Sequence, residues 1–161
     1  MNKSTETALL LWFNKGTHHA GQGRHAKAIA CFDRALEINP RDVSALFNKA
    51  NSLAMSGRIE EALPCYDLSL DIYPSYAEAW CNKGYSLYLL GRYTEAIDCL
   101  DHALKQNRFD AASLYNRAIA EDALGHKTEA VHYFKRFLMN AKPEMGKEIK
   151  EVRQRLQELG K

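Results

Sequence analysis

Three histidines near the start of the chain form the densest group of possible metal ligands in the sequence. His18 and His19 are neighbours, and His25 follows a short distance later. Successive residues of a helix point about 100° apart, so His18 and His19 face different directions. A zinc site also needs a fourth ligand or a nearby carboxylate, and none stands at a ligating spacing. The sequence therefore predicts no metal site.

The remaining polar residues form no constellation typical of an enzyme. No nucleophile with a neighbouring base stands out, and the phosphate-binding pattern GxxxxGK[ST] does not occur. The pairs Asp101–His102 and Glu121–Asp122 are interpreted as ordinary helix residues. We therefore expect no catalytic residue, no cofactor and a non-enzymatic protein.

A repeated pair, Asn followed by Lys or Arg, is the most regular polar pattern of the chain. Its four asparagines follow one another at intervals of 34 residues and are Asn14, Asn48, Asn82 and Asn116. Asn offers both a donor and an acceptor, which matches a peptide group. The column could hold the backbone of an extended segment, or it could serve contacts within a repeated architecture.

Other residues share this interval, which is typical of stacked supersecondary units. The recurring glycines are Gly23, Gly57, Gly91 and Gly125, and the recurring alanines are Ala28, Ala62, Ala96 and Ala130. Small residues also recur at Gly16, Ala50, Gly84 and Ala118. In the first unit these residues predict a helix over about 10–22 that ends at a glycine, and a second over about 25–39 that ends before Pro40.

The pattern resembles the signature of the tetratricopeptide repeat family, W-x₂-L-G-x₂-Y…A-x₃-F…P. The residues of the first unit that match it are Trp12, Gly16, Ala28, Phe32 and Pro40. A departure occurs at Arg108, where the third unit would have Pro. The resemblance covers Leu9 to about Glu144. It implies an all-α fold, a right-handed superhelical solenoid of four helix–turn–helix repeats.

We expect a single domain over residues 1–161, with repeats at about 9–42, 43–76, 77–110 and 111–144. The segment that follows has an apolar stripe made of Ile149, Val152, Leu156 and Leu159. We expect it to form a capping helix at about 145–159 that covers the last repeat.

The asparagines are expected to face away from the surface on which paired helices pack. On a helical wheel Asn14 lies roughly 160–220° from Trp12, Gly16 and His19. In the family that the chain resembles, this opposite face lines a concave groove, and such grooves commonly bind peptides. The candidate peptide-binding residues are Phe13, Asn14, Phe47, Asn48, Asn51, Asn82, Tyr85, Tyr88, Tyr115 and Asn116. We expect a scaffold or adaptor that holds an extended peptide or a helix of a partner protein.

The basic member of each pair is expected to pack rather than to bind phosphate. Lys15 lies about 100° from Asn14, toward the packing face, where its long stem can cover apolar neighbours. The equivalent residues are Lys49, Lys83 and Arg117. The net charge of +2 adds no argument for nucleic acid, so we predict no such partner.

Some proteins of the resembled family hold the C-terminal carboxylate of a chaperone with a clamp of Lys, Asn and Arg residues. The matching positions here are Phe13, Thr17, Asn48, Glu78 and Asn82. Only Asn48 fits, and Glu78 has the opposite charge, so the sequence does not support a chaperone carboxylate clamp.

An alternative function comes from the apolar segment Leu9–Phe13, which is apolar all round a helix. Leu10 and Phe13 are therefore candidates for an exposed surface at the open N-terminal end. A self-assembling structural scaffold that oligomerises through this end is the second interpretation.

The chain contains no apolar stretch near the roughly 18 residues of a membrane span, so we expect no membrane partner. Cys31, Cys65 and Cys99 also recur at intervals of 34 residues and are interpreted as core residues of a reducing compartment. We expect a cytoplasmic protein.

Overall fold

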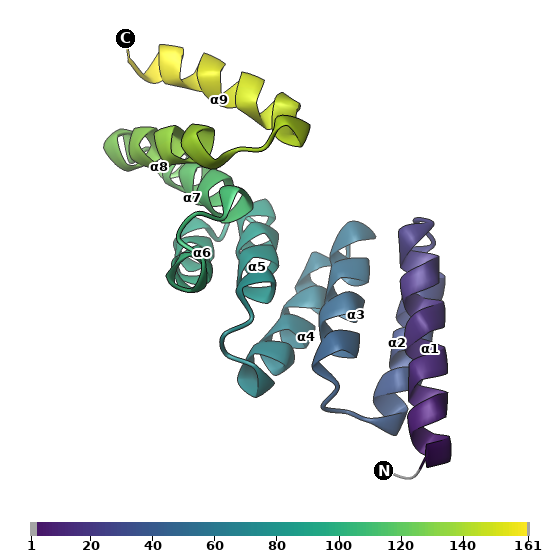
Figure 1. Ribbon diagram of the computed structural model, residues 1–161. Coiled ribbons are helices and arrows are strands. Elements are labelled where there is room, and N and C mark those ends of the chain that lie inside the picture. Colours follow the sequence, from purple (N-terminus) through teal and green to yellow (C-terminus); the bar gives the residue numbers. More distant parts are fainter. Residues whose placement is uncertain (1–2, 161) are drawn as a thin grey trace. The chain divides into compact units, whose positions relative to one another are not determined.

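The computed structural model describes residues 3–160, which form helices joined by short turns (Figure 1). Within this range there are nine α-helices, one short 3-10 helix and no strand. The helices are α1 (Lys3–Gly21), α2 (His25–Ile38), α3 (Val43–Met55), α4 (Ile59–Ile72), α5 (Ala77–Leu89), α6 (Tyr93–Gln106), α7 (Ala111–Ala123), α8 (Lys127–Asn140), the 3-10 helix η1 (Pro143–Met145) and α9 (Gly146–Leu159). The predicted all-α helical repeat fold is therefore confirmed.

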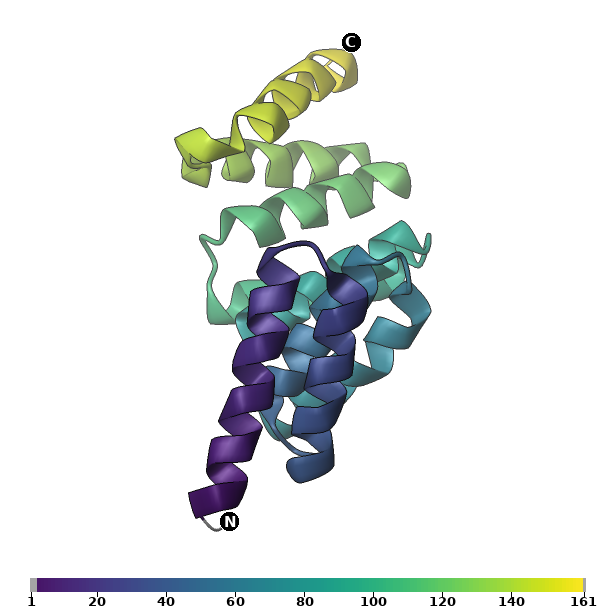
Figure 2. The ribbon, with the colours of Figure 1, turned by 90° about the vertical axis from the view of Figure 1, so that its right-hand side faces the viewer.

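The helices belong to two compact units, Met1–Ala79 and Trp80–Lys161, and α5 begins in the first and continues in the second. In the first unit α1 packs against α2, α2 against α3, and α3 against α4. Figure 2 shows α1 and α2 lying antiparallel beside each other. In the second unit α6 packs against α7, α7 against α8, and α8 against α9.

The turn inside each helix pair depends on a glycine. Gly23, Gly57, Gly91 and Gly125 have φ angles of 70°, 81°, 74° and 79°, a region that residues with a Cβ rarely adopt. The residue after each glycine donates its N–H back to the ending helix, as Arg24 does to the carbonyl of His19 at 2.9 Å. The interval of 34 residues between glycines therefore fixes where each first helix ends.

The first helix is longer than the sequence predicted, because it begins at Lys3 rather than near Leu10. The residues before Leu9 are mostly polar and show no apolar periodicity. They are stabilised locally instead: the hydroxyl of Thr7 donates to the carbonyl of Lys3 at 2.9 Å, and Glu6 lies in the first turn, where a negative charge favours the helix dipole.

Small residues let the two helices of a pair approach closely. Ala28, Ala62, Ala96 and Ala130 are each fully buried. A Cβ at Gly16 would lie 2.5 Å from the ring of Phe32, and one at Gly84 would lie 2.8 Å from Cγ of Leu100. The glycines at these positions are therefore required by their large neighbours.

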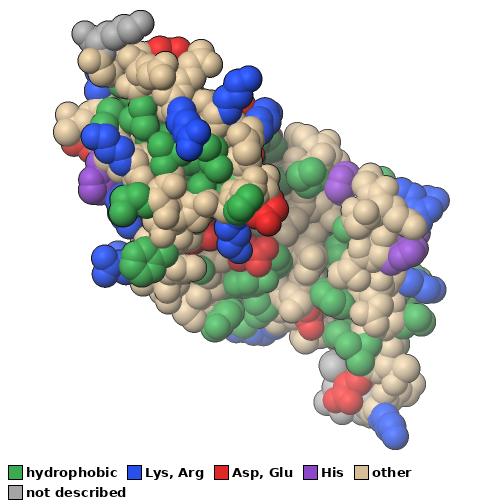
Figure 3. Space-filling view, turned by 45° about the horizontal axis from the view of Figure 1, so that its top comes forward, with side chains coloured by type: hydrophobic (Ala, Val, Ile, Leu, Met, Phe, Trp, Pro, Cys, Tyr) green, Lys and Arg blue, Asp and Glu red, His purple; other side chains and the backbone are tan. Residues whose placement is uncertain are grey.

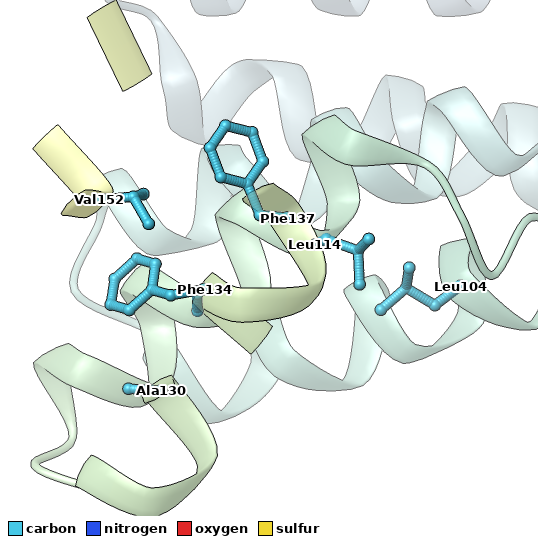
Figure 4. Packing of buried hydrophobic residues seen from close by; sticks show 7 residues of the cluster. Leu104, Leu114, Ala130, Phe134, Phe137 and Val152 are labelled. Carbon is cyan, nitrogen blue, oxygen red and sulfur yellow. The ribbon is translucent and has the colours of Figure 1, made fainter. Parts of the chain in front are cut away.

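The last helix closes the core of the second unit. Val152 of α9 is 1% exposed and lies beside Phe134 and Phe137 of α8 (Figure 4). Ile149, Leu156 and Leu159 are partly buried against the same cluster. The apolar stripe in the sequence thus identified the residues through which α9 packs. No helix among the described residues is long and apolar enough to cross a membrane.

Candidate protein-interaction surface

The predicted binding residues divide between the two units. Those of the first unit lie on α1 and α3 and are Phe13, Asn14, Phe47, Asn48 and Asn51. Those of the second unit lie on α5 and α7 and are Asn82, Tyr85, Tyr88, Tyr115 and Asn116.

In the first unit the asparagines are in different environments. Asn14 is exposed, whereas Asn48 is half-buried and its Nδ2 donates to the carbonyl of Ser44 at 2.8 Å. The amide oxygen of Asn51 accepts from the hydroxyl of Tyr66, a core residue, at 2.5 Å. Asn14 is thus the most accessible of the three to a partner, while Asn51 also supports the α3–α4 packing.

The aromatic residues of the first unit are more buried than the helical wheel indicated. Phe47 is only 5% exposed, because the rings of Tyr66 and Tyr76 cover it at centroid distances of 6.2 and 4.7 Å. The expectation that Phe47 presents a binding surface is therefore wrong for this structure. Phe13 is half-buried and packs on Phe32 at 6.0 Å.

In the second unit three tyrosines form a continuous aromatic group, which we call the tyrosine surface: Tyr85, Tyr88 and Tyr93. The rings of Tyr85 and Tyr88 are stacked at 6.2 Å with an interplanar angle of 15°, and Tyr88 meets Tyr93 of α6 at 5.5 Å. Tyr85 is 42% exposed. Tyr93 was not among the predicted residues, since it lies at the start of a second helix.

The electrostatic surroundings of Tyr88 connect this group with α7. The pKa of Tyr88 is raised, and burial is the largest cause. The neighbouring Tyr93 and Tyr85 and the carboxylate of Asp122 raise this pKa further. Asp122 thus contributes negative charge beside the aromatic rings.

Asn116 differs from the other members of its column. It is 9% exposed, and its Nδ2 donates to Sγ of Cys81 on α5 at 3.5 Å. The expectation that Asn116 faces a ligand is wrong here, because the side chain links two first helices instead. This is the role in contacts between repeats that the sequence left open.

Helix α9 lies against part of the surface predicted to bind peptide. The hydroxyl of Tyr115 donates to Glu151 at 3.2 Å, and burial together with Glu151 raises the pKa of Tyr115 to about 12. Arg155 donates to both carboxylate oxygens of Asp122, at 2.7 and 2.9 Å. These residues line a cavity of about 100 Å³ between α7, α8 and α9. The side chain of Tyr115 is thus partly covered by α9, the last helix of the same chain.

The basic column packs as the sequence predicted. The ammonium groups of Lys15 and Lys83 lie over the rings of Trp12 and Trp80, at 4.9 and 5.4 Å from the ring centroids. Lys49 pairs with Asp33 at 2.6 Å. In each of these three residues the charged end of the side chain therefore lies beside a ring or a carboxylate of the same chain.

Arg117 is the most buried member of the basic column. It is 8% exposed and forms ion pairs with Asp101, at 2.9 Å, and with Glu121, which is itself 4% exposed. The second oxygen of Glu121 lies 2.7 Å from Nδ1 of His126. Glu121, which the sequence indicated to be an ordinary helix residue, is therefore part of a buried network with Arg117 and His126.

The three histidines lie at one end of the first unit. The rings of His18 and His19 are 6.0 Å apart, and Nδ1 of His19 and of His25 is buried without a hydrogen-bond partner. Among residues 3–160 no group of His, Cys, Asp and Glu residues is arranged to hold a metal ion. The burial of His19 lowers its pKa, and the nearby charges of Arg24 and Lys27 lower it further.

The cysteines lie mainly in the core. Cys31, Cys81 and Cys99 are buried, and Cys65 is half-buried. Burial raises the pKa of Cys65, which keeps its thiol protonated and poorly reactive.

Paired helices, glycine turns and a residue pattern repeating every 34 positions define a helical repeat protein. Comparison with family models identifies it further: a tetratricopeptide repeat model matches residues 13–77, and a second model of the same description matches residues 77–110. The chain therefore belongs to the tetratricopeptide repeat family. Domains of this family are protein-interaction modules and are generally non-catalytic. A search of curated protein sequences finds no match.

Solved structures show the same fold at low sequence identity. MamA from Desulfovibrio magneticus RS-1, residues 41 to the end, is 18% identical and matches with a TM-score of 0.78 over 95% of each chain. The pilF protein of Pseudomonas aeruginosa is 21% identical, with a TM-score of 0.81 over 97% of this chain and 72% of that one. The first such domain of Spaghetti (RPAP3), bound to the HSP90 peptide SRMEEVD, is 19% identical, with a TM-score of 0.72 over 74% of this chain and 94% of that one.

Proposed function

We propose that the protein is an adaptor that binds an extended peptide or a helix of a partner protein on the faces of its first helices. The observation that carries this proposal is the stacked pair of the exposed Tyr85 and the half-buried Tyr88 on α5, with Asn82 one turn earlier on the same helix. Tyrosine suits such a surface because it has a large apolar ring, a polar end and few rotatable bonds.

The asparagines complement the aromatic rings. An amide side chain can both donate to and accept from the backbone of a bound segment, which gives orientation without selecting a side chain. Asn14 is exposed on α1 in the first unit, and Asn82 is half-buried on α5. In the second unit we assign backbone recognition to Asn82 and side-chain contacts to the tyrosine surface, and in the first unit we assign backbone recognition to Asn14.

A related fold with a bound peptide supports the proposal. The Spaghetti (RPAP3) domain holds the HSP90 peptide in its solved structure. This chain lacks the basic residues of a carboxylate clamp, with Phe13 and Glu78 at two of its positions. We therefore expect recognition to depend on aromatic and amide contacts rather than on a terminal carboxylate.

Affinity enrichment from an extract of the native host tests the proposal. The double variant Asn82→Ala/Tyr85→Ala should lose the partner that the wild type retains. Tyr73→Ala is a matched control, because Tyr73 is 51% exposed but lies at the end of α4 and is not part of the tyrosine surface. With a synthetic segment of the captured partner, we expect the double variant to bind at least about tenfold more weakly. Equal binding by all three proteins would refute the proposal.

Exposed leucines on α1 favour self-assembly as a second candidate function. Leu10 and Leu11 are 56% and 51% exposed, whereas Phe13 is held against Phe32. A second copy of the chain could cover these leucines. Light scattering over a dilution series tests this. If the chain self-assembles, its molar mass in solution should fall on dilution, and the Leu10→Lys variant should have a lower molar mass than the wild type at the same concentration. A mass of one chain at every concentration excludes it.

A further inference from the structure

A bidentate ion pair recurs at the start of the second helices. Arg58 donates to both carboxylate oxygens of Glu61, each at 2.7 Å, and Arg92 does the same to Glu95 at 2.7 and 2.5 Å. In both repeats the arginine follows the turn glycine and the glutamate comes three residues later. At the turn between the two helices of each of these repeats, the charge of the arginine is therefore neutralised by a glutamate of the same repeat.

The first repeat lacks this carboxylate. Its arginine is Arg24, but the residue three positions later is Lys27, so the charge at that position is reversed. The segment from Thr7 to Phe32 contains no Asp and no Glu. Within residues 3–160, neither Arg24 nor Lys27 forms an ion pair, and the nearest following carboxylate, Asp33, is paired with Lys49.

Further cationic and titratable side chains surround this position. We call the set the basic corner, and it consists of Lys15, His18, His19, Arg24, His25 and Lys27. Arg24, Lys27 and His18 are exposed, and Figure 3 shows Lys, Arg and His side chains gathered at this end of α1 and α2, at the right of the view. The lowered pKa of His19 reflects its burial and then the positive charge of Arg24 and Lys27.

The basic corner also offers a concave surface. An open depression of about 400 Å³ is lined by the turn and the first residues of α2, with Ser56 of the next turn on its other side. Its residues are Gly23, Arg24, His25, Ala26, Lys27 and Ser56. Nδ1 of His25 is buried there without a hydrogen-bond partner.

We propose that the basic corner binds an acidic segment of a partner protein. A carboxylate of the segment binds the guanidinium of Arg24. It does so in the way that Glu61 binds Arg58 and Glu95 binds Arg92. The ligand chemistry is that of an Asp or Glu side chain, because carboxylates occupy the equivalent position in two other repeats of this chain. Lys27 supplies a second cation for a neighbouring carboxylate of the same segment.

This surface lies at the turn between α1 and α2 and shares no residue with the tyrosine surface. The two proposals can therefore fail separately. Exposed charge pairs are individually weak and are screened by salt, so several carboxylates are needed and binding should weaken as salt is added.

Fluorescence anisotropy of the full chain with a labelled peptide of alternating Glu and Ser measures this binding. A peptide in which Gln replaces Glu, and a single-stranded oligonucleotide, are the comparison probes. The wild type should bind the Glu peptide at least about tenfold more tightly than the Gln peptide, because bidentate contacts to Arg require the charged carboxylate. Equal binding of the two peptides, or tighter binding of the oligonucleotide, would overturn the proposal.

Two reciprocal variants make the test specific. Lys27→Glu recreates in the first repeat the pair seen at Arg58 and Glu61, and should lower the affinity for the Glu peptide about tenfold. Glu61→Lys removes the carboxylate from Arg58 and should raise that affinity. Thermal unfolding of each variant checks that the fold is retained, and Arg24→Gln is the second variant if Lys27→Glu unfolds. Unchanged affinity in Lys27→Glu or Arg24→Gln contradicts the proposal, and Tyr85→Ala should leave the binding intact.

Discussion

Lys49 in the first unit and Arg117 in the second occupy the same repeat position, yet their environments differ. Each pairs with an aspartate of the preceding second helix, Asp33 or Asp101. The side chain of Lys49 is 25% exposed, whereas that of Arg117 is 10% exposed. One column of the sequence thus gives a partly solvated ion pair in one unit and a buried one in the other.

The neighbouring column explains the difference. One turn after the basic residue the middle repeats have Leu53 and Leu87, each 2% exposed, whereas the last repeat has Glu121 at 4% exposure. A buried carboxylate needs compensation, and Glu121 receives Arg117 on one oxygen and His126 on the other. The comparison teaches that one substitution in a core column gives the adjacent basic residue a second, buried carboxylate partner in addition to its aspartate.

Removal of the buried cation should have the largest effect. Arg117→Ala leaves Glu121 without its main partner, and we expect a loss of about 3–5 kcal/mol in the free energy of unfolding, measured with urea. The same substitution at Lys49 is the matched control and should cost about 1 kcal/mol or less. Similar losses at both positions would mean that burial is not what distinguishes them.

The double variant Arg117→Lys/Glu121→Leu sharpens this comparison, because it gives the last repeat the residue pair of the middle ones. Apolar replacement of a buried ion pair is often neutral or stabilising, so the double variant should be at least as stable as the wild type within about 1 kcal/mol. A loss as large as that of Arg117→Ala would show that the network itself is required.

Close packing inside the pairs should give the next largest effect. Ala50 and Ala118 have a Cβ where Gly16 and Gly84 have none, and a Cβ added at Gly16 or Gly84 would lie less than 3.0 Å from a side chain of the paired helix. Gly16→Ala forces the ring of Phe32 to move, with an expected loss of about 1–3 kcal/mol in urea unfolding. Gly21→Ala is the control, since nothing lies within 4 Å of its added Cβ and the substitution favours the helix. A neutral Gly16→Ala would show that Phe32 can repack freely.

The contact between α9 and Tyr115 predicts a smaller effect that depends on pH. The folded chain raises the pKa of Tyr115 from its usual value near 10 to about 12. Above pH 10 the unfolded state therefore releases its proton more readily, and stability should fall as the pH rises from about 10 to about 12. Tyr115→Phe should reduce this slope in unfolding experiments at several pH values. The substitution should not abolish the slope, because the pKa values of Tyr76 and Tyr88 are also raised. An unchanged slope would contradict the assignment.

How far the sequence predicted the structure depends on whether a property is local to one repeat. The helix ends were predictable, because Gly23 and its equivalents must adopt positive φ at fixed intervals. The burial of Phe47 and Asn116 was not predictable, because a helical wheel describes a single helix. The residues that contact them, Tyr76 and Cys81, come from neighbouring elements. The apolar stripe predicted α9, but its position beside Tyr115 and Asp122 depends on Glu151 and Arg155, which lie outside that stripe.

The smallest predicted effect concerns the solvated pair of the first unit. Asp33→Asn removes the partner of Lys49, and we expect a loss below about 1 kcal/mol that shrinks further at high salt, because the pair is partly exposed and screened. A double-mutant cycle with Lys49→Met isolates the coupling energy, and the same cycle on Arg117 and Asp101 provides the comparison. The coupling should be larger for Arg117, whose guanidinium is held by Asp101 and Glu121 together and lies over the ring of Tyr133 at 4.8 Å. Equal couplings in the two cycles would mean that the repeat position alone sets the strength of the pair, and that Glu121 contributes nothing to it.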